Sequence, residues 1–200
     1  MRDYFWGEKK DDQPQDPMSV HEFASETKGH ASTDNNVVDT LHNRIYFYSG
    51  VTRPKILTLN KSIFSLNVNM LSKTGPLQYE PPPIILHINS YGGSVFAGLA
   101  AVDYIRNSKI PVHTVIDGCA ASAATLMSCV GSHRMMHKNS CMLVHQLSGV
   151  MWGKFQEMQD DMENSEMLME KIKNIYREHT KIPKKEMDNM NKELSDLQNE

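Results

Sequence analysis

Apolar residues follow two alternating patterns along residues 43–177. Short runs that are rich in β-branched or aromatic residues end at glycine or polar turns, which is typical of strands. Between and after these runs, apolar residues recur at helical spacing. The predicted strands are Arg44–Tyr48, Ile84–Ile88, Val112–Ile116, Arg134–Met136 and Cys141–Val144, and the predicted helices span residues 56–71, 95–105, 120–130 and 155–177.

The order of these elements predicts an α/β fold. Strands that alternate with helices need crossover connections, which favour a largely parallel sheet. Turns are predicted at Asn89–Gly93, Asp117–Gly118 and Lys138–Asn139, where polar or glycine residues interrupt the pattern. Because ligands of open parallel sheets bind beyond the carboxyl ends of the strands, the residues that follow the strands are the first candidates for a site.

Residues 1–40 have a different composition from the rest of the chain. They contain four basic and nine acidic residues, and their few apolar residues follow no period. Such a segment buries too little surface to offset its ordering entropy. We therefore expect an acidic, disordered N-terminal extension at residues 1–40 and one folded domain at residues 41–200.

Charge and cysteine content exclude several classes of function. With 21 basic and 24 acidic residues, the chain has no basic surplus for binding nucleic-acid phosphates. No apolar run is long enough to span a membrane, and residues 1–16 lack the apolar stretch of a signal peptide. The three cysteines match neither a disulfide framework nor a zinc motif. We expect a cytoplasmic protein without a metal or other cofactor.

Three segments place chemically active groups after predicted strands. Residues 89–94 contain two consecutive glycines, which allow the backbone N–H groups to approach a ligand closely. Residues 118–123 put Ser122 at the beginning of a helix, and His145 follows the strand at residues 141–144. Taken singly, these are also a tight turn, a helix cap and a structural histidine. Together they supply a nucleophile, a base and donors for an oxyanion, which acyl transfer requires.

The same three segments resemble the ClpP family of self-compartmentalised serine peptidases. The matching residues are Ile88–Val95, Gly118–Ser122 and His145–Gln146, in the family's order and spacing, and similarity extends from about residue 38 to residue 183. The resemblance implies a ClpP/crotonase-like fold with crossover helices. It also implies that residues 155–177 form a protruding handle helix that interlocks two rings.

The resemblance further implies roles for individual residues. It assigns Ser122 as the nucleophile and His145 as the general base. The backbone N–H groups of Gly93 and Ala123 would bind the oxyanion. The implied substrate-binding residues are Gly92, Ser94 and Gln146.

Two features depart from the family's pattern. Tyr91 and Leu147 replace the prolines that normally precede the glycine pair and follow the His-Gln motif. The third triad position falls on Leu194, which cannot orient an imidazole; we expect Asp196, if any residue of this chain, to take that role, with Glu193 as the nearer alternative. The family normally continues with another helix and strand, so we expect a truncated or divergent C-terminal end.

These observations predict a serine endopeptidase that hydrolyses peptides and unfolded proteins inside a ring-shaped chamber. The resemblance implies a homo-oligomer of heptameric rings stacked in pairs. It also implies an AAA+ ATP-dependent unfoldase as partner, because the chain contains no G-x-x-x-x-G-K-[ST] loop of its own.

Other interpretations remain open. The chain could be a catalytically weak or inactive ClpP-like subunit in a mixed ring, or a crotonase-type acyl-CoA enzyme, although crotonases generally use carboxylates. A Ser–Lys peptidase would need Lys138 or Lys154 as its base. His133 and His137 have the spacing of metal ligands on a helix, but they fall in a predicted strand and turn without a third ligand nearby.

Overall fold

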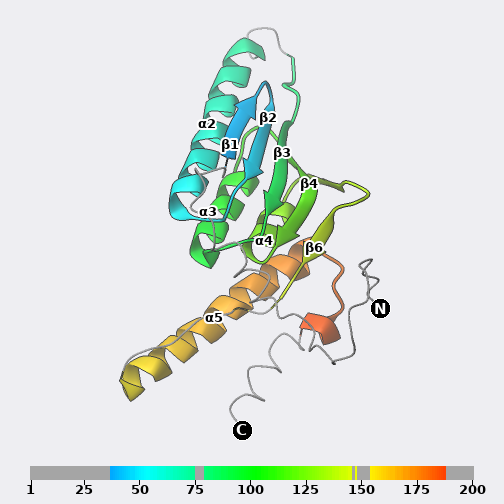
Figure 1. The fold of residues 1–200 in the computed structure, drawn as a ribbon. Helices are drawn as coiled ribbons and strands as arrows, with labels where there is room; N and C mark the ends of the chain where they lie inside the picture. Colours follow the sequence, from blue (N-terminus) through cyan, green and yellow to red (C-terminus); the bar gives the residue numbers. More distant parts are fainter. Residues whose placement is uncertain (1–36, 75–78, 146, 148–153, 188–200) are drawn as a thin grey trace, which may run out of the picture. The chain divides into compact units, whose positions relative to one another are not determined.

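The computed structural model describes residues 37–74, 79–145, 147 and 154–187. Helices and strands alternate through this part of the chain, which forms an α/β fold as the sequence predicted (Figure 1). The elements are β1 (Val37–Leu41), β2 (Arg44–Tyr48), α2 (Arg53–Thr74), β3 (Ile84–Ser90), α3 (Val95–Arg106), β4 (Val112–Ala121), α4 (Ala123–Cys129), β5 (His133–Met136), β6 (Cys141–Leu143) and α5 (Phe155–His179).

The strands form one sheet in which β4 is the central element. The order is β1-β2-β3-β4-β5, and β6 also pairs with β4. Only β1 and β2 pair in antiparallel fashion; the other pairs among the described strands are parallel. Residues 113–116 of β4 pair with β5, and residues 119–121 pair with β6. The last residues of β4 therefore lie between β6 on one side and Ser90, the last residue of β3, on the other.

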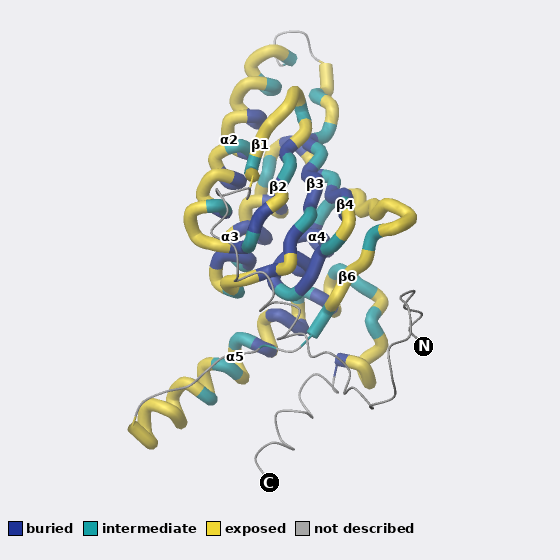
Figure 2. The backbone as a smooth tube through the Cα atoms, viewed as in Figure 1, coloured by how far each residue is buried: buried dark blue, intermediate teal, exposed yellow. Residues whose placement is uncertain are grey.

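The hydrophobic core lies between the sheet and helices α2, α3 and α4 (Figure 2). The apolar run of β3 is buried at Ile84, Leu86 and Ile88, and the helical stripe at residues 56–66 of α2 belongs to the same core. Every residue of α4 is buried. Because α4 is enclosed by packed side chains, it gives the end of β4 a firm support.

The end of β4 and the beginning of α4 differ from the sequence prediction in a way that affects the site, and several other boundaries differ by one to three residues. The turn predicted at Asp117–Gly118 is wrong, because β4 continues through it to Ala121. Gly118 has a φ of 88°, which a glycine adopts at no steric cost, and the register between β3 and β4 shifts nearby. The helix predicted from residue 120 accordingly begins at Ala123. Ala120 and Ala121 favour a helix by themselves, but pairing with β3 and β6 keeps them in the strand.

Strand β1 was not predicted from the sequence. Four of its five residues are exposed, so it lacks the alternation of buried and exposed positions that marks a strand. Its antiparallel ladder with β2 is what makes it a strand. The rest of the acidic segment, residues 1–36, lies outside the described residues. The disorder of residues 1–36 therefore remains a prediction, whereas residues 37–40, expected in the same extension, pair with β2 and belong to the sheet.

Helix α5 corresponds to the predicted handle helix. Its second half packs against α4 and is buried at Met169, Ile172 and Tyr176. Its first half is exposed, with 82% of Phe155 accessible to solvent, and Figure 1 shows it extending away from the sheet. No helix in the described ranges is long and apolar enough to cross a membrane.

Candidate active site

Ser122 lies at the junction between β4 and α4 in an unusual backbone conformation. Its φ is 54° and its ψ is −127°, a region that non-glycine residues rarely adopt. Its side chain makes no hydrogen bond that caps α4, so capping does not explain the serine. Hydrolases of other folds expose a nucleophilic hydroxyl on a similarly strained turn between strand and helix.

Hydrogen bonds from several elements hold this conformation. The Ser122 N–H donates to the Leu143 carbonyl of β6 at 2.9 Å, and the Ser122 carbonyl accepts from the N–H of Thr125 at 2.9 Å and from its Oγ1 at 2.5 Å. The Tyr176 hydroxyl lies 2.5 Å from Thr125 Oγ1. Because the single Thr125 hydroxyl proton goes to Ser122, Tyr176 is the donor to Thr125. Burial raises the pKa of Tyr176 to about 12, so it keeps this proton at neutral pH.

The glycine turn after β3 lies directly against Ser122. A Cβ atom on Gly92 would be 2.6 Å from the Ser122 Cβ, and the φ of Gly92 is 94°. Gly93 also has a positive φ, of 143°. Val51 holds the turn from the other side, since its N–H donates to the Gly92 carbonyl at 2.7 Å and its carbonyl accepts from the Ser94 N–H at 2.8 Å. Only glycines fit between these two contacts.

The proposed oxyanion donors are available for a ligand. Within the described part of the chain, neither the Gly93 N–H nor the Ala123 N–H donates a hydrogen bond. Ala123 is the first residue of α4, where backbone N–H groups have no partner inside the helix. The Ser122 N–H is already bonded to β6 and cannot serve. These facts support Gly93 and Ala123 as donors.

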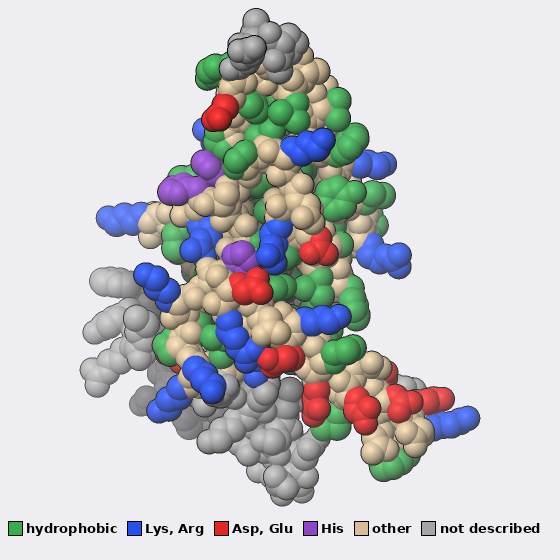
Figure 3. All heavy atoms as spheres, turned by 180° about the vertical axis from the view of Figure 1, so that it is seen from behind, with side chains coloured by type: hydrophobic (Ala, Val, Ile, Leu, Met, Phe, Trp, Pro, Cys, Tyr) green, Lys and Arg blue, Asp and Glu red, His purple; other side chains and the backbone are tan. Residues whose placement is uncertain are grey.

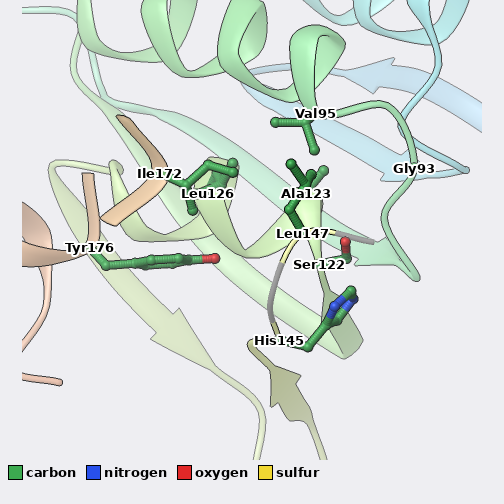
Figure 4. A pocket seen from close by; sticks show the side chains of 9 residues that line it. All are labelled: Gly93, Val95, Ser122, Ala123, Leu126, His145, Leu147, Ile172 and Tyr176. Atoms are coloured by element: carbon green, nitrogen blue, oxygen red, sulfur yellow. The ribbon is translucent and has the colours of Figure 1, made fainter. Parts of the chain in front are cut away.

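His145 lies near Ser122 because β6 brings it there. Leu143, the last residue of β6, pairs with Ala121 of β4. The two backbone segments that follow these residues therefore begin side by side, one leading to His145 and the other to Ser122. Both side chains are half-buried and line one pocket. Figure 4 shows the His145 ring extending toward the Ser122 hydroxyl. Residues from two separate sequence motifs thus meet at the predicted edge of the sheet.

The remaining predicted site residues have different positions. Ser94 is the N-cap of α3, and its Oγ accepts from the Ala97 N–H at 3.3 Å, so its role in substrate binding stays a prediction. Gln146, Glu193 and Asp196 lie outside the described residues. Neither of the lysines considered as alternative bases lines the pocket around Ser122.

The two histidines considered as metal ligands have separate neighbours. His137 Nε2 is 3.0 Å from Asp117 Oδ1, and the His133 ring lies 5.3 Å from the His113 ring, measured between centroids. Among the described residues, no group of three or more histidine, cysteine, aspartate or glutamate side chains is placed to hold a metal ion.

The pocket beside Ser122 contains residues that the sequence analysis did not assign to the site. The cavity has a volume of about 60 Å³ and lies between the glycine turn, α4 and α5 (Figure 4). Besides Ser122 and His145, its lining includes the side chains of Val95, Leu126, Leu147, Ile172 and Tyr176. In the sequence, most of these residues are recognisable only as apolar positions at helical spacing. Their meeting at one pocket depends on how α5 packs against α4.

We predict that Gly92→Ala destabilises the protein and that Gly50→Ala does not. The added methyl group at Gly92 collides with Ser122 and requires a strained φ, which costs about 1–3 kcal/mol of unfolding free energy. At Gly50 the nearest atom would be 3.8 Å away, so the same substitution should change stability by less than about 1 kcal/mol. Denaturant unfolding measures both, and equal effects of the two substitutions would contradict the packing described here.

Comparison with known proteins agrees with this architecture. A family model of the Clp protease matches residues 48–195. A Synechococcus protein named ATP-dependent Clp protease proteolytic subunit 2 is 31% identical over 138 residues, which cover 66% of this chain and 70% of the relative. A protein of the same name from Parasynechococcus marenigrum is 30% identical over 141 residues, covering 68% of this chain and 72% of the relative.

A solved structure has a similar fold. The ClpP1 point mutant from Listeria monocytogenes superposes with a TM-score of 0.61 at 21% identity, covering 74% of this chain and 78% of that one. This likeness concerns the fold, whereas the family model spans the segments that carry both Ser122 and His145. The chain belongs to the Clp protease family.

Proposed function

We propose that this protein is a serine endopeptidase, with Ser122 as nucleophile and His145 as general base. The observation that carries the proposal is that Ser122, strained and without a capping role, shares a pocket with His145. Membership of the Clp protease family, whose two relatives described above are named proteolytic subunits, supports the same reaction. No observation favours a crotonase-type reaction.

The proposed reaction follows from these positions. His145 accepts the hydroxyl proton while the Ser122 oxygen attacks the peptide carbonyl carbon. The resulting oxyanion accepts hydrogen bonds from the Gly93 and Ala123 N–H groups. The C–N bond then breaks as His145 returns the proton to the leaving amine. Water hydrolyses the acyl-enzyme by the same sequence of proton transfers, which regenerates Ser122.

The substrate class follows from the lining of the pocket. Leu126 and Ile172 are apolar, and the Tyr176 hydroxyl is already bonded to Thr125. Beside these two apolar side chains, away from Ser122 and His145, a polar substrate group would lose hydrogen bonds to water without gaining a partner. We therefore propose that the pocket receives a small apolar side chain next to the bond that is cleaved, and that peptides and unfolded proteins are the substrates.

Assembly is proposed from the exposed half of α5. Phe155 and Met158, three residues apart on one side of this helix, are exposed, and Figure 3 shows acidic side chains gathered over the same region. An apolar surface on a protruding helix is typical of a contact with another subunit. The proposed assembly is a homo-oligomer of paired heptameric rings in the cytoplasm. An AAA+ unfoldase would supply it with unfolded chains.

Replacement of either member of the proposed dyad should abolish peptide hydrolysis. Ser122→Ala and His145→Ala are each expected to lower kcat/KM by about a thousandfold or more, because attack needs both the nucleophile and the base. Ser72→Ala is the matched control, since Ser72 is exposed on α2 and its Oγ donates to the Asn69 carbonyl of the same helix. A fluorophosphonate that labels another residue and leaves Ser122 unmodified in active protein would contradict the assignment.

The third triad member is tested by Asp196→Asn, with Glu193→Gln as the matched control. If Asp196 orients His145, the first substitution lowers turnover by about a thousandfold or more and the second does not. Unchanged turnover in both variants would indicate a dyad, or a carboxylate from another subunit. Absence of turnover in the intact wild-type oligomer would instead favour a non-proteolytic subunit.

Ring assembly should appear in sedimentation of the purified protein. The expected species contains about seven copies of the 22.7 kDa chain, or a multiple of that number. Phe155→Glu should reduce the mass by weakening the contact of α5, whereas Asn164→Ala, exposed on the opposite side of the helix, should not. A monomer at all micromolar concentrations would contradict the proposed assembly.

A further inference from the structure

Two free cysteines face each other on neighbouring strands. Cys119 of β4 and Cys141 of β6 are direct partners in the parallel ladder. Paired residues project from the same face of a sheet, and neighbouring strands lie about 4.8 Å apart. A disulfide spans Cα atoms that are about 4.4–6.8 Å apart, so the backbone already has the separation that a cross-link needs.

The exposure of these thiols distinguishes them from the third cysteine. Cys141 is exposed and Cys119 is half-buried, whereas Cys129 is buried within α4. Burial raises the pKa of Cys119 to about 11, and the neighbouring Cys141 thiol contributes to that shift. Burial likewise raises the pKa of Cys129 to about 11. An oxidant in solution therefore meets Cys141 first, with the Cys119 thiol next to it.

The pair lies where β6 has few other attachments. All three residues of β6 are exposed, and its ladder joins it to β4 alone among the described strands. Cys119 precedes Ser122 by three residues, and Cys141 precedes His145 by four. A bond between the two sulfurs would fasten the short strand that leads to His145 onto the strand that leads to Ser122.

We propose that Cys119 and Cys141 form a reversible intramolecular disulfide when the protein meets a peroxide, and that this bond restrains β6 on β4. The modification site does not require the proposed peptidase activity. In a reducing compartment such a bond forms transiently, as in proteins that respond to oxidants.

The reaction is balanced with hydrogen peroxide as oxidant. The Cys141 sulfur attacks one peroxide oxygen, the O–O bond breaks, and a sulfenic acid and one water are produced. The Cys119 sulfur then attacks the Cys141 sulfur, the S–O bond breaks, and the second water leaves. Two thiols and one peroxide thus give one disulfide and two waters. A dithiol reductant returns two electrons and two protons.

Mapping the cross-link requires a variant, because trypsin leaves Cys119 and Cys129 on one peptide, residues 110–134. Cys141 lies on the peptide of residues 139–154. In Cys129→Ser, native protein treated with peroxide should yield these two peptides joined by a bond that a reductant breaks. The joined peptides should be absent from Cys119→Ser, in which Cys141 oxidises further. Two results would overturn the proposal: a disulfide that links two protein molecules in place of the intramolecular bond, or the absence of the cross-linked peptides from peroxide-treated Cys129→Ser.

The rate of closure has an expected dependence on pH. The attacking group is the Cys119 thiolate; burial, the largest cause of its raised pKa, remains after Cys141 is oxidised, so Cys119 is mostly protonated at neutral pH. Closure should therefore accelerate by about tenfold for each unit of pH between about pH 7 and pH 9, when the sulfenic acid is trapped in competition with dimedone, a carbon acid that is fully ionised throughout this range. A closure rate that does not change over this range would exclude Cys119 as the attacking thiol.

The restraint on β6 is measured by amide hydrogen exchange over residues 141–145. Exchange in this segment should slow in the oxidised Cys129→Ser protein and return to its original rate after reduction. Peroxide-treated Cys119→Ser is the matched control and should show no slowing. A mapped disulfide without slower exchange would overturn the proposed effect on β6. Because no substrate is used, failure here is distinct from failure of the proposed hydrolysis.

Discussion

The contact between Gly92 and Ser122 is the constraint on which the geometry of the site depends. No side-chain atom fits between them, since a Cβ on Gly92 would lie 2.6 Å from that of Ser122. The contact places the glycine turn, with the Gly93 N–H, beside the start of α4, with the Ala123 N–H. In this arrangement Ser122 has a strained backbone conformation, which costs about 1–3 kcal/mol of folding free energy. Hydrogen bonds from Leu143 and Thr125 offset that cost.

Side chains as well as backbone ladders tie together the strands that lead to the site. Asp117 Oδ2 accepts from the Tyr48 hydroxyl at 2.7 Å and lies 2.8 Å from His87 Nδ1, while Arg44 lies 2.9 Å from His87 Nε2. Since Arg44 can only donate, His87 Nε2 accepts and Nδ1 carries the proton toward Asp117. This network links β2, β3 and β4 close to the turn that the sequence analysis wrongly placed at Asp117.

Strand β6 combines several functions in three residues. It supplies the Leu143 carbonyl that holds the Ser122 N–H, it leads directly to His145, and it carries Cys141 opposite Cys119. A displacement of this strand would therefore change the positions of Ser122, His145 and the thiol pair together. The thiol pair follows from the cysteines at positions 119 and 141, which the ladder between β4 and β6 makes direct neighbours.

The sequence by itself determined the α/β class, most strands and helices, and the three motifs, because hydrophobic period and turn residues are local signals. It did not show β1, whose exposed residues carry no alternation, nor the passage of β4 through Gly118, which pairing with β3 and β6 decides. Tertiary structure alone decided that Tyr176 of the handle helix reaches Thr125, and that Leu126 and Ile172 share a pocket with Ser122. The physical reason is that these contacts join residues far apart in the chain, so they depend on how the elements pack rather than on any local pattern.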